Sequence, residues 1–392
     1  MKNWLGHANM PDKTNATLDE IFGGNPESRI ADTGNAIRKT LSDSRGVLVF
    51  GAGNNGRRIA SLLPSQGCPV LGFIDEVAEN QGKLIADLPV HSLEAASQLY
   101  GPDVAIVVSI FNPAHSFVKT RKKLGLHGWT SLSIFHLCLL YPDTFLPFYS
   151  AGVSDAILQN RQTYETLYRS LVDDRSKDEL IAHLKFRLFA DFDALPDPIG
   201  LDFAHIKDRL ADDIAFIDGG AFDGDSIQAF LKVAGDRFAS IVAYEPDSRN
   251  FSKLSAFCQS LPPSVRDRIG IRNKGVWSHG GRIGFNETST PGSSFHPEAV
   301  NTVEVVSLDE DIQLESAAFI KLDVEGAEMA SLHGARNIIQ RGEAIFSIAV
   351  YHEPDDLWKI PQLIEQYNEH YRFGLRSHGY DGADLMLYAF PA

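Results

Sequence analysis

The stretch FIDGGAFDGD (residues 216–225), followed after a short amphipathic segment by IVAYEPD (241–247), decides how this chain folds. Each segment begins as an apolar run and stops at a carboxylate, Asp218 in the first and Glu245 in the second. Buried parallel strands end in this way at the ligand edge of a sheet. We therefore expect two parallel strands joined by one helix, with a nucleoside pocket at their ends.

The turn between them follows the pattern Asp-x-Gly-x-x-x-Gly and contains Gly220 and Gly224. We expect these glycines to allow a sharp turn and the close approach of a ligand, while the helix that begins near Asp225 offers unpaired N–H groups. Glu245 stands where a second strand presents a carboxylate to both hydroxyls of a ribose. The acid at the end of the first strand, Asp218, suits a positively charged ligand such as S-adenosylmethionine. The structural alternative is a tight turn that binds nothing.

Two later segments repeat the theme of a strand that ends in polar groups. FIKLDVEGAE (319–328) is an apolar strand that stops at Asp323, and we expect Glu325 and Glu328 to open the helix that follows. SIAVYHEPDDLWKIP (347–361) predicts a strand that runs directly into a Tyr-His pair. These groups should meet at the same edge of the sheet as the nucleoside pocket.

The four segments together resemble the FkbM family of methyltransferases. In that family an Asp-x-Gly-Ala turn, a Glu-Pro pair, a Lys-x-Asp-x-Glu-Gly-x-Glu block and a late Tyr-His recur in this order, and the resemblance covers residues 211–392. One position departs from the pattern, because Phe222 stands where the family usually has Asn. The resemblance implies a class I methyltransferase sheet of seven strands and S-adenosylmethionine as the methyl donor. It also implies a small-molecule, sugar or glycan acceptor, or a natural product, methylated on a hydroxyl. The residues expected to bind the cofactor are Asp218, Gly219, Gly220, Ala221, Gly224, Asp225, Glu245, Pro246 and Asp323.

Methyl transfer requires alignment of acceptor and donor and the removal of one proton. In this architecture the groups that face the methyl are expected to be Asp323, Glu325, Tyr351 and His352. We expect His352 to be the general base, because a neutral imidazole accepts a proton near pH 7; Asp323 could instead hold the ammonium group of the donor or the acceptor. The alternatives are a structural role for His352 and a helix-dipole role for the glutamates. Carboxylates and imidazole suit Mg, Mn or Fe, but the spacing does not demand a metal.

A second glycine loop lies near the start of the chain. VLVF (47–50) predicts a strand that leads into GAGNNG (51–56), and PVLGFID (69–75) predicts a second strand. With this spacing Gly51, Gly53, Gly56 and Asp75 satisfy the dinucleotide fingerprint. Similar FGAGxxG domains precede sugar-modifying enzymes, so a second site for a nucleotide or nucleotide sugar is one expectation and a ligand-free module is the other.

This loop supports two alternative functions. One is an NAD-dependent sugar oxidoreductase or epimerase, although the chain lacks the Tyr-x-x-x-Lys expected nearby in such enzymes. The other is a non-catalytic module that binds a nucleotide sugar.

The fold class expected from these patterns is α/β, with the seven-strand methyltransferase sheet at the C-terminus, a smaller N-terminal Rossmann-like domain and a helical connector. In the connector we expect one long helix capped by Ser154 and a capping box formed by Ser176 and Glu179. The C-terminal domain should contain one strand over 270–277 and an inserted hairpin over 281–309 with a flexible PGSS turn. The expected divisions are a helical lead-in (1–45), the Rossmann-like domain (46–150), the connector (151–210) and the methyltransferase domain (211–392).

Composition limits the partners. The chain has 392 residues and a net charge of −15 with no basic run, which argues against nucleic acid or anionic lipid as a partner. Its three cysteines are far apart, which favours free thiols in a reducing compartment. The first residues lack the apolar core of a signal peptide, and no apolar stretch is long enough to cross a bilayer. We therefore expect a cytoplasmic protein without a membrane span, and the sequence leaves a homo-oligomer open.

Overall fold

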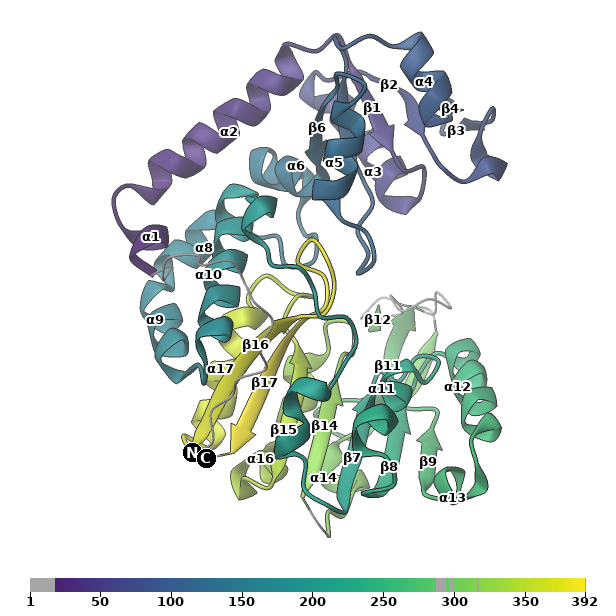
Figure 1. Ribbon diagram of the computed structural model, residues 1–392, viewed down its shortest axis with the longest axis vertical. Coiled ribbons are helices and arrows are strands. Elements are labelled where there is room, and N and C mark those ends of the chain that lie inside the picture. Colours follow the sequence, from purple (N-terminus) through teal and green to yellow (C-terminus); the bar gives the residue numbers. More distant parts are fainter. Residues whose placement is uncertain (1–17, 287–293, 296–298, 300, 316, 392) are drawn as a thin grey trace.

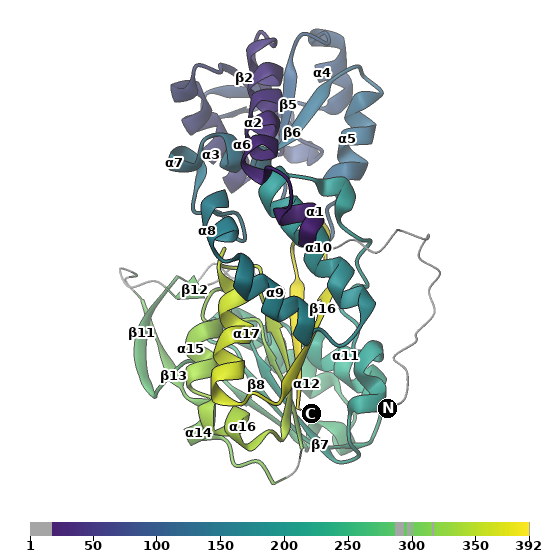
Figure 2. The same cartoon turned by 90° about the vertical axis from the view of Figure 1, so that its left-hand side faces the viewer.

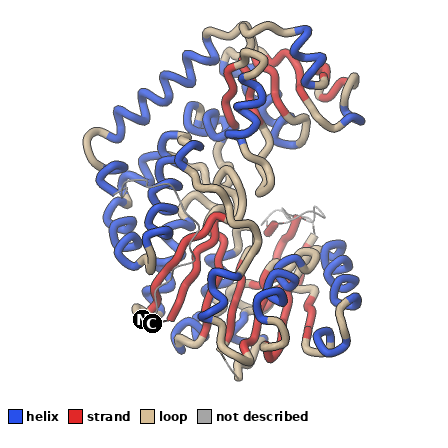
Figure 3. Tube along the Cα trace, in the orientation of Figure 1, coloured by secondary structure: helices blue, strands red, loops and turns tan. Residues whose placement is uncertain are grey.

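The computed structural model describes residues 18–286, 294–295, 299, 301–315 and 317–391. Two sheets lie at opposite ends of the molecule, and three connecting helices lie along one side between them (Figure 1, Figure 2). The tube view shows that loops from both sheets meet in the middle (Figure 3). This meeting of loops positions the site described below.

The N-terminal sheet has six strands in the order β3-β4-β2-β1-β5-β6, and all neighbouring pairs except β3 and β4 are parallel. The predicted strand at 47–50 is β1, which is buried throughout. Asn25 caps α2 (Pro26–Ser42) by accepting from the amide of Ser28. The strands are β1 (Val47–Phe50), β2 (Val70–Ile74), β3 (Leu84–Ile85), β4 (Leu88–His91), β5 (Ala105–Val108) and β6 (Thr130–Ser133). The helices are α1 (Leu18–Phe22), α2 (Pro26–Ser42), α3 (Asn54–Leu62), α4 (Leu93–Leu99), α5 (Phe117–Gly125), α6 (Ile134–Leu140) and α7 (Pro142–Phe145).

The C-terminal sheet has the expected seven strands, in the order β16-β17-β15-β14-β7-β8-β9. Its central strands are parallel and buried, and β17 joins antiparallel to β15 and β16. The strands are β7 (Ile214–Gly219), β8 (Phe238–Tyr244), β9 (Ile269–Arg272), β14 (Ala318–Leu322), β15 (Ala344–Ala349), β16 (Tyr371–Ser377) and β17 (Leu385–Pro391). The helices are α11 (Asp225–Ala234), α12 (Ser248–Ser260), α13 (Pro263–Arg266), α14 (Leu308–Asp311), α15 (Glu328–His333), α16 (Arg336–Arg341) and α17 (Asp356–Tyr367).

The predicted strand over 270–277 is wrong, because the chain changes sheet within it. β9 ends at Arg272, and Asn273 then donates its side-chain amide to the carbonyl of Glu245 at 2.8 Å. The next strand, β10 (Gly275–Val276), pairs instead with β13 (Thr302–Val306) in a small four-stranded sheet. The inserted hairpin is confirmed, since β11 (Gly281–Asn286) pairs antiparallel with β13 and with β12 (Ser294–Phe295). Residues 291–293 of its expected turn lie outside the described residues.

The connector contains three helices. The single long helix expected from Ser154 is divided in two, and the capping box expected at Ser176 and Glu179 is not formed. α8 (Ser154–Gln159) includes Ser154 as its first residue, and the chain breaks at Asn160 before α9 (Arg161–Ser170). α10 (Asp174–Phe189) is capped by Asp173, which accepts from the amide of Ser176. Glu179 is buried and accepts instead from the hydroxyl of Ser377 at 2.6 Å. α10 therefore covers the edge strand β16, which removes an open edge that other chains could pair with.

Candidate functional site

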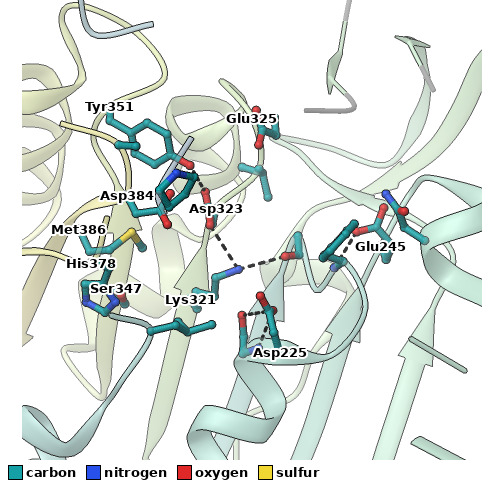
Figure 4. A pocket seen from close by; sticks show the side chains of 18 of the residues that line it. Asp225, Glu245, Lys321, Asp323, Glu325, Ser347, Tyr351, His378, Asp384 and Met386 are labelled. Atoms are coloured by element: carbon teal, nitrogen blue, oxygen red, sulfur yellow. Dashed lines mark hydrogen bonds and ion pairs between the residues drawn. The ribbon is translucent and has the colours of Figure 1, made fainter. Parts of the chain in front are cut away.

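A cavity of about 480 Å³ lies at the carboxyl ends of the parallel strands, within the range typical of small-molecule sites. Figure 4 shows its polar lining, which runs from Glu245 after β8, past Lys321 on β14, to Tyr351 and Asp384 at the other end. This is the edge of the sheet at which open α/β folds bind ligands.

Glu245 lies at one end of this lining, in the loop after β8. Its carboxylate is 5% exposed, and each oxygen accepts one backbone N–H, from Phe222 at 2.9 Å and from Asp247 at 2.8 Å. Burial raises the pKa of Glu245 to about 7, although these two N–H groups oppose the shift. Because each carboxylate oxygen has a second lone pair, the group can still accept two hydrogen bonds from a ribose. Phe222 donates its backbone N–H within this turn, but it lacks the side-chain amide of the Asn that the family usually has at this position.

The glycines of the turn allow close packing of the chain. A Cβ on Gly220 would lie 1.9 Å from the carbonyl oxygen of Asp323, and one on Gly224 would lie 2.3 Å from the Phe257 ring. Both residues also have positive φ, at 78° and 98°. Glycine is therefore required at both positions for the turn and for packing, and the close approach of a ligand there stays a prediction.

Asp218 is fully buried and does not belong to the described lining of the cavity. It lies 3.4 Å from the ammonium of Lys321, which in turn donates to the carbonyl of Gly220 at 3.0 Å. Burial raises the pKa of Asp218 to about 6 against the opposing effect of Lys321. Asp218 thus pairs with Lys321, which holds the glycine turn. Because Asp218 does not line the cavity, its position does not support direct contact with a cationic ligand. Of the other cofactor residues expected from the sequence, Gly220, Asp225, Glu245, Pro246 and Asp323 line the cavity, and Gly219, Ala221 and Gly224 are not among its described lining residues.

The other end of the cavity contains a carboxylate–imidazole cluster, formed by Asp323, Glu325, Glu328 and His352. Glu328 is the first residue of α15 and is 1% exposed; its two oxygens accept from the amides of Val324 at 2.8 Å and Gly326 at 3.0 Å. The same carboxylate binds Nδ1 of His352 at 2.8 Å. Glu325 lies before the helix with φ of +52°, so the expectation that it opens the helix is wrong.

The second ring nitrogen of His352 faces the other two acids. Nε2 lies 3.5 Å from Glu325 and 3.7 Å from Asp323, and both of these carboxylates line the cavity. Burial lowers the pKa of His352, but Glu328 and Glu325 more than offset this effect, and its pKa lies well above the usual range. Burial also raises the pKa of Glu325. His352 itself is not among the described residues that line the cavity.

Residues 218–381 match the family model described as Methyltransferase FkbM domain. This part of the chain is an FkbM methyltransferase domain. The protein is therefore a methyltransferase, as its motifs predict.

A solved structure shares the fold of nearly the whole chain. The crystal structure of methyltransferase FkbM from Methylobacillus flagellatus KT aligns with a TM-score of 0.73 at 20% identity, and covers 93% of this chain and 99% of that chain. At this identity the likeness establishes the fold, including the N-terminal sheet. A precorrin-6y C5,15-methyltransferase from Geobacter metallireducens GS-15 aligns at 16% identity over 47% of this chain and 84% of that chain. Its TM-score of 0.29 is too low to indicate a shared fold. No match was found among curated proteins.

Sequence reasoning missed the polar groups that β15 and the segment between β16 and β17 bring to the FkbM domain's cavity. Asp384 lines the cavity from the turn between β16 and β17, and burial together with Asp323 raises its pKa to about 7. His378 and Ser347 line the same end, and burial lowers the pKa of His378 to about 4. Asp384 lies in HGYDGAD, a segment whose sequence indicates only a turn; its φ of +50° is the one local sign of a special position.

The N-terminal sheet supplies one wall of the cavity. Phe111, Asn112 and Pro113 follow β5, and Tyr149 follows α7; all four line the cavity. The rings of Phe111 and Tyr149 lie 4.7 Å apart. The sequence does not predict this wall, because it depends on contacts between segments that are far apart in the chain.

Two hydrogen bonds, each donated by a backbone amide, hold the turn of Asp384 against this wall. The amide of Tyr380 donates to Pro113 at 2.9 Å, and the amide of Phe117 donates to the carboxylate of Asp381 at 2.7 Å. The cavity is therefore built jointly by the FkbM domain and the N-terminal sheet.

The first glycine loop has a different character. Both oxygens of Asp75 are engaged by backbone amides, those of Ala52 and Val77, each at 2.8 Å. A Cβ on Gly56 would lie 2.0 Å from the carbonyl oxygen of Gly51, so this glycine allows close packing of α3 on β1. None of Gly51, Gly53, Gly56 and Asp75 lines the cavity of the FkbM domain. These contacts explain Asp75 and Gly56 by chain packing and backbone hydrogen bonds. A second nucleotide site at this loop stays a prediction.

Proposed function

We propose that this protein is an S-adenosylmethionine-dependent O-methyltransferase that acts on a hydroxyl of a sugar, glycan or natural product. The observation that carries the proposal is the single cavity that joins the Glu245 end to the polar end at Asp323, Tyr351 and Asp384. S-adenosylmethionine would supply an activated methyl group. Its nucleoside fits the end where Glu245 keeps two free lone pairs beside the turn at Gly220 and the start of α11.

The aromatic wall and the acids suit the acceptor. Phe111 and Tyr149 offer apolar faces to a ring, while Asp323, Glu325 and Asp384 accept hydrogen bonds from hydroxyls. We propose that Asp384 accepts the hydroxyl proton, because it lines the cavity and interacts with the Tyr351 hydroxyl. His352, the base expected from the sequence, would instead position Asp323 and Glu325 from behind.

The compartment is part of the same proposal. Among the described residues, no helix combines the length and the apolar character that a membrane span needs. Cys68, Cys138 and Cys258 are buried and free, which supports a reducing compartment, the cytoplasm.

Calorimetric titration of the purified protein with S-adenosylhomocysteine tests the cofactor assignment. We expect one site per chain and a raised melting temperature, and a parallel titration with NAD should give neither. Labelled S-adenosylmethionine with a panel of glycosides then tests the acceptor class, with the methylated atom located by NMR. The absence of S-adenosylhomocysteine binding would refute the cofactor assignment, and a methyl group on nitrogen or carbon would refute O-methylation.

A further inference from the structure

We propose that the carboxylate–imidazole cluster binds one divalent transition-metal ion such as Mn²⁺, with Asp323, Glu325 and His352 as ligands and Glu328 as the residue that orients the ring. An oxygen of Asp323, an oxygen of Glu328 and a ring nitrogen of His352 all lie within 4.8 Å of one another. Acidic residues alone would not make a site. The imidazole of His352 adds a buried nitrogen ligand beside them.

Nε2 of His352 is a buried polar atom without a hydrogen-bond partner among the described residues, on a side chain that is 4% exposed. Its separations from Glu325 and Asp323, 3.5 and 3.7 Å, exceed the usual range for an N–H···O hydrogen bond. Two ligand atoms that each lie about 2.1 Å from one ion are roughly 3.0 to 3.5 Å apart. Both separations are therefore closer to those between ligands of one small cation than to those between hydrogen-bonded partners.

Glu328 fixes the ring in the orientation that a metal ligand needs. Its carboxylate can only accept, so the contact at Nδ1 requires a proton there, and an ion that binds Nε2 takes the place of the second proton of the ring. The carboxylate is itself held by the amides of Val324 and Gly326. A carboxylate that binds the far nitrogen of a histidine is a recurrent support for metal ligands.

The charges around the cluster also favour a cation. Asp323, Glu325 and Glu328 bring three carboxylates to one largely buried place. The nearby cation, Lys321, lies 3.4 Å from Asp218 and reaches only the other oxygen of Asp323, Oδ2, at 3.6 Å, while Oδ1 faces His352. Two carboxylates with one imidazole suit Mn²⁺ or Fe²⁺ better than the all-oxygen sites of Mg²⁺ or Ca²⁺.

The consequence for chemistry rests on the proposed function. Because Asp323 and Glu325 line the cavity, an ion at the cluster would face the acceptor and would make its hydroxyl proton easier to lose. The proton would pass to the Asp384 carboxylate as the oxygen forms its new bond to carbon. The carbon–sulfur bond breaks with its electron pair left on sulfur, and the ion keeps its oxidation state.

Calorimetry and electron paramagnetic resonance with Mn²⁺ alone test the site on chelator-treated protein. We expect one Mn²⁺ per chain, with affinity reduced about tenfold or more in Glu325→Gln and in Asp323→Asn, which change charge and not shape. The matched control is Asp225→Asn, which removes a carboxylate from the opposite wall of the same cavity and should keep the affinity.

The proposal is overturned if the intact protein does not bind Mn²⁺ at millimolar concentration, if both cluster variants keep full affinity, or if Asp225→Asn weakens binding as much as they do. S-adenosylhomocysteine titrations of the same samples without metal report separately on the cofactor assignment. A loss of metal binding is thereby distinguished from a failure of the proposed function.

Discussion

Replacement of Glu245 by glutamine should weaken the binding of S-adenosylhomocysteine while the fold persists. In the ligand-free protein each carboxylate oxygen already accepts one backbone N–H, which leaves one lone pair on each oxygen for a ribose hydroxyl. Glutamine keeps one acceptor oxygen and places an NH₂ group where the other stood. One charge-assisted hydrogen bond to the ligand is then lost, which is worth about 1.5 to 3 kcal/mol. The dissociation constant should rise roughly 10- to 100-fold.

The stability of this variant is a poor test, because two effects oppose each other. The NH₂ group would face the amide of Phe222 or Asp247, and an unsatisfied buried donor costs about 1 to 3 kcal/mol. Removal of a buried charge works in the other direction, since burial raises the pKa of Glu245 to about 7. Affinity measured by calorimetry is therefore the deciding quantity.

The matched control for Glu245→Gln is Glu343→Gln, an exposed acid just before β15 at the opposite edge of the sheet. It should leave the affinity unchanged. A dissociation constant for Glu245→Gln within twofold of the unaltered protein would show that this carboxylate does not bind the ligand.

Two further predictions concern the pH dependence of ligand binding and the stability of the first glycine loop. Because the pKa of Glu245 is about 7 and the ionised carboxylate is the form that accepts two hydroxyls, S-adenosylhomocysteine should bind about tenfold more weakly at pH 6 than at pH 8; equal affinity at both values would contradict the assignment. In the first glycine loop, Gly56→Ala should lower the free energy of unfolding by about 2 kcal/mol or more, because its Cβ would lie 2.0 Å from the Gly51 carbonyl oxygen. Gly53→Ala should be neutral, because no atom lies within 4 Å of its Cβ, and equal losses in urea unfolding would refute the packing role of Gly56.

The sequence predicts the parts of the site in which a strand and the acid at its end are adjacent in the chain. β7, β8, β14 and β15 and the polar residues after them follow this rule, because an apolar run fixes the strand and the end of the run fixes the edge. The same pattern cannot show what a carboxylate binds. Asp75 and Asp218 both end strands as expected, yet backbone amides occupy the first and Lys321 pairs with the second.

Residues brought in by tertiary contacts were beyond the sequence patterns. Asp384 sits on a turn whose position depends on Pro113, in the loop after β5, and on Phe117, the first residue of α5. The capping box at Ser176 failed because Asp173, three residues earlier, caps the helix and pairs with Arg376 at 2.9 Å. A local sequence pattern does not show which of several nearby side chains will cap a helix.

The joint construction of the cavity separates two kinds of evolutionary change. The Glu245 end belongs wholly to the FkbM domain, whereas the wall at Phe111 and Tyr149 belongs to a sheet that carries none of the family motifs. Under the proposed function, substitutions in the loops after β5 and α7 would alter which acceptor is admitted without any change in the residues proposed to bind the donor. The acceptor would then diversify through the N-terminal part of the chain while the residues at the Glu245 end stay constant.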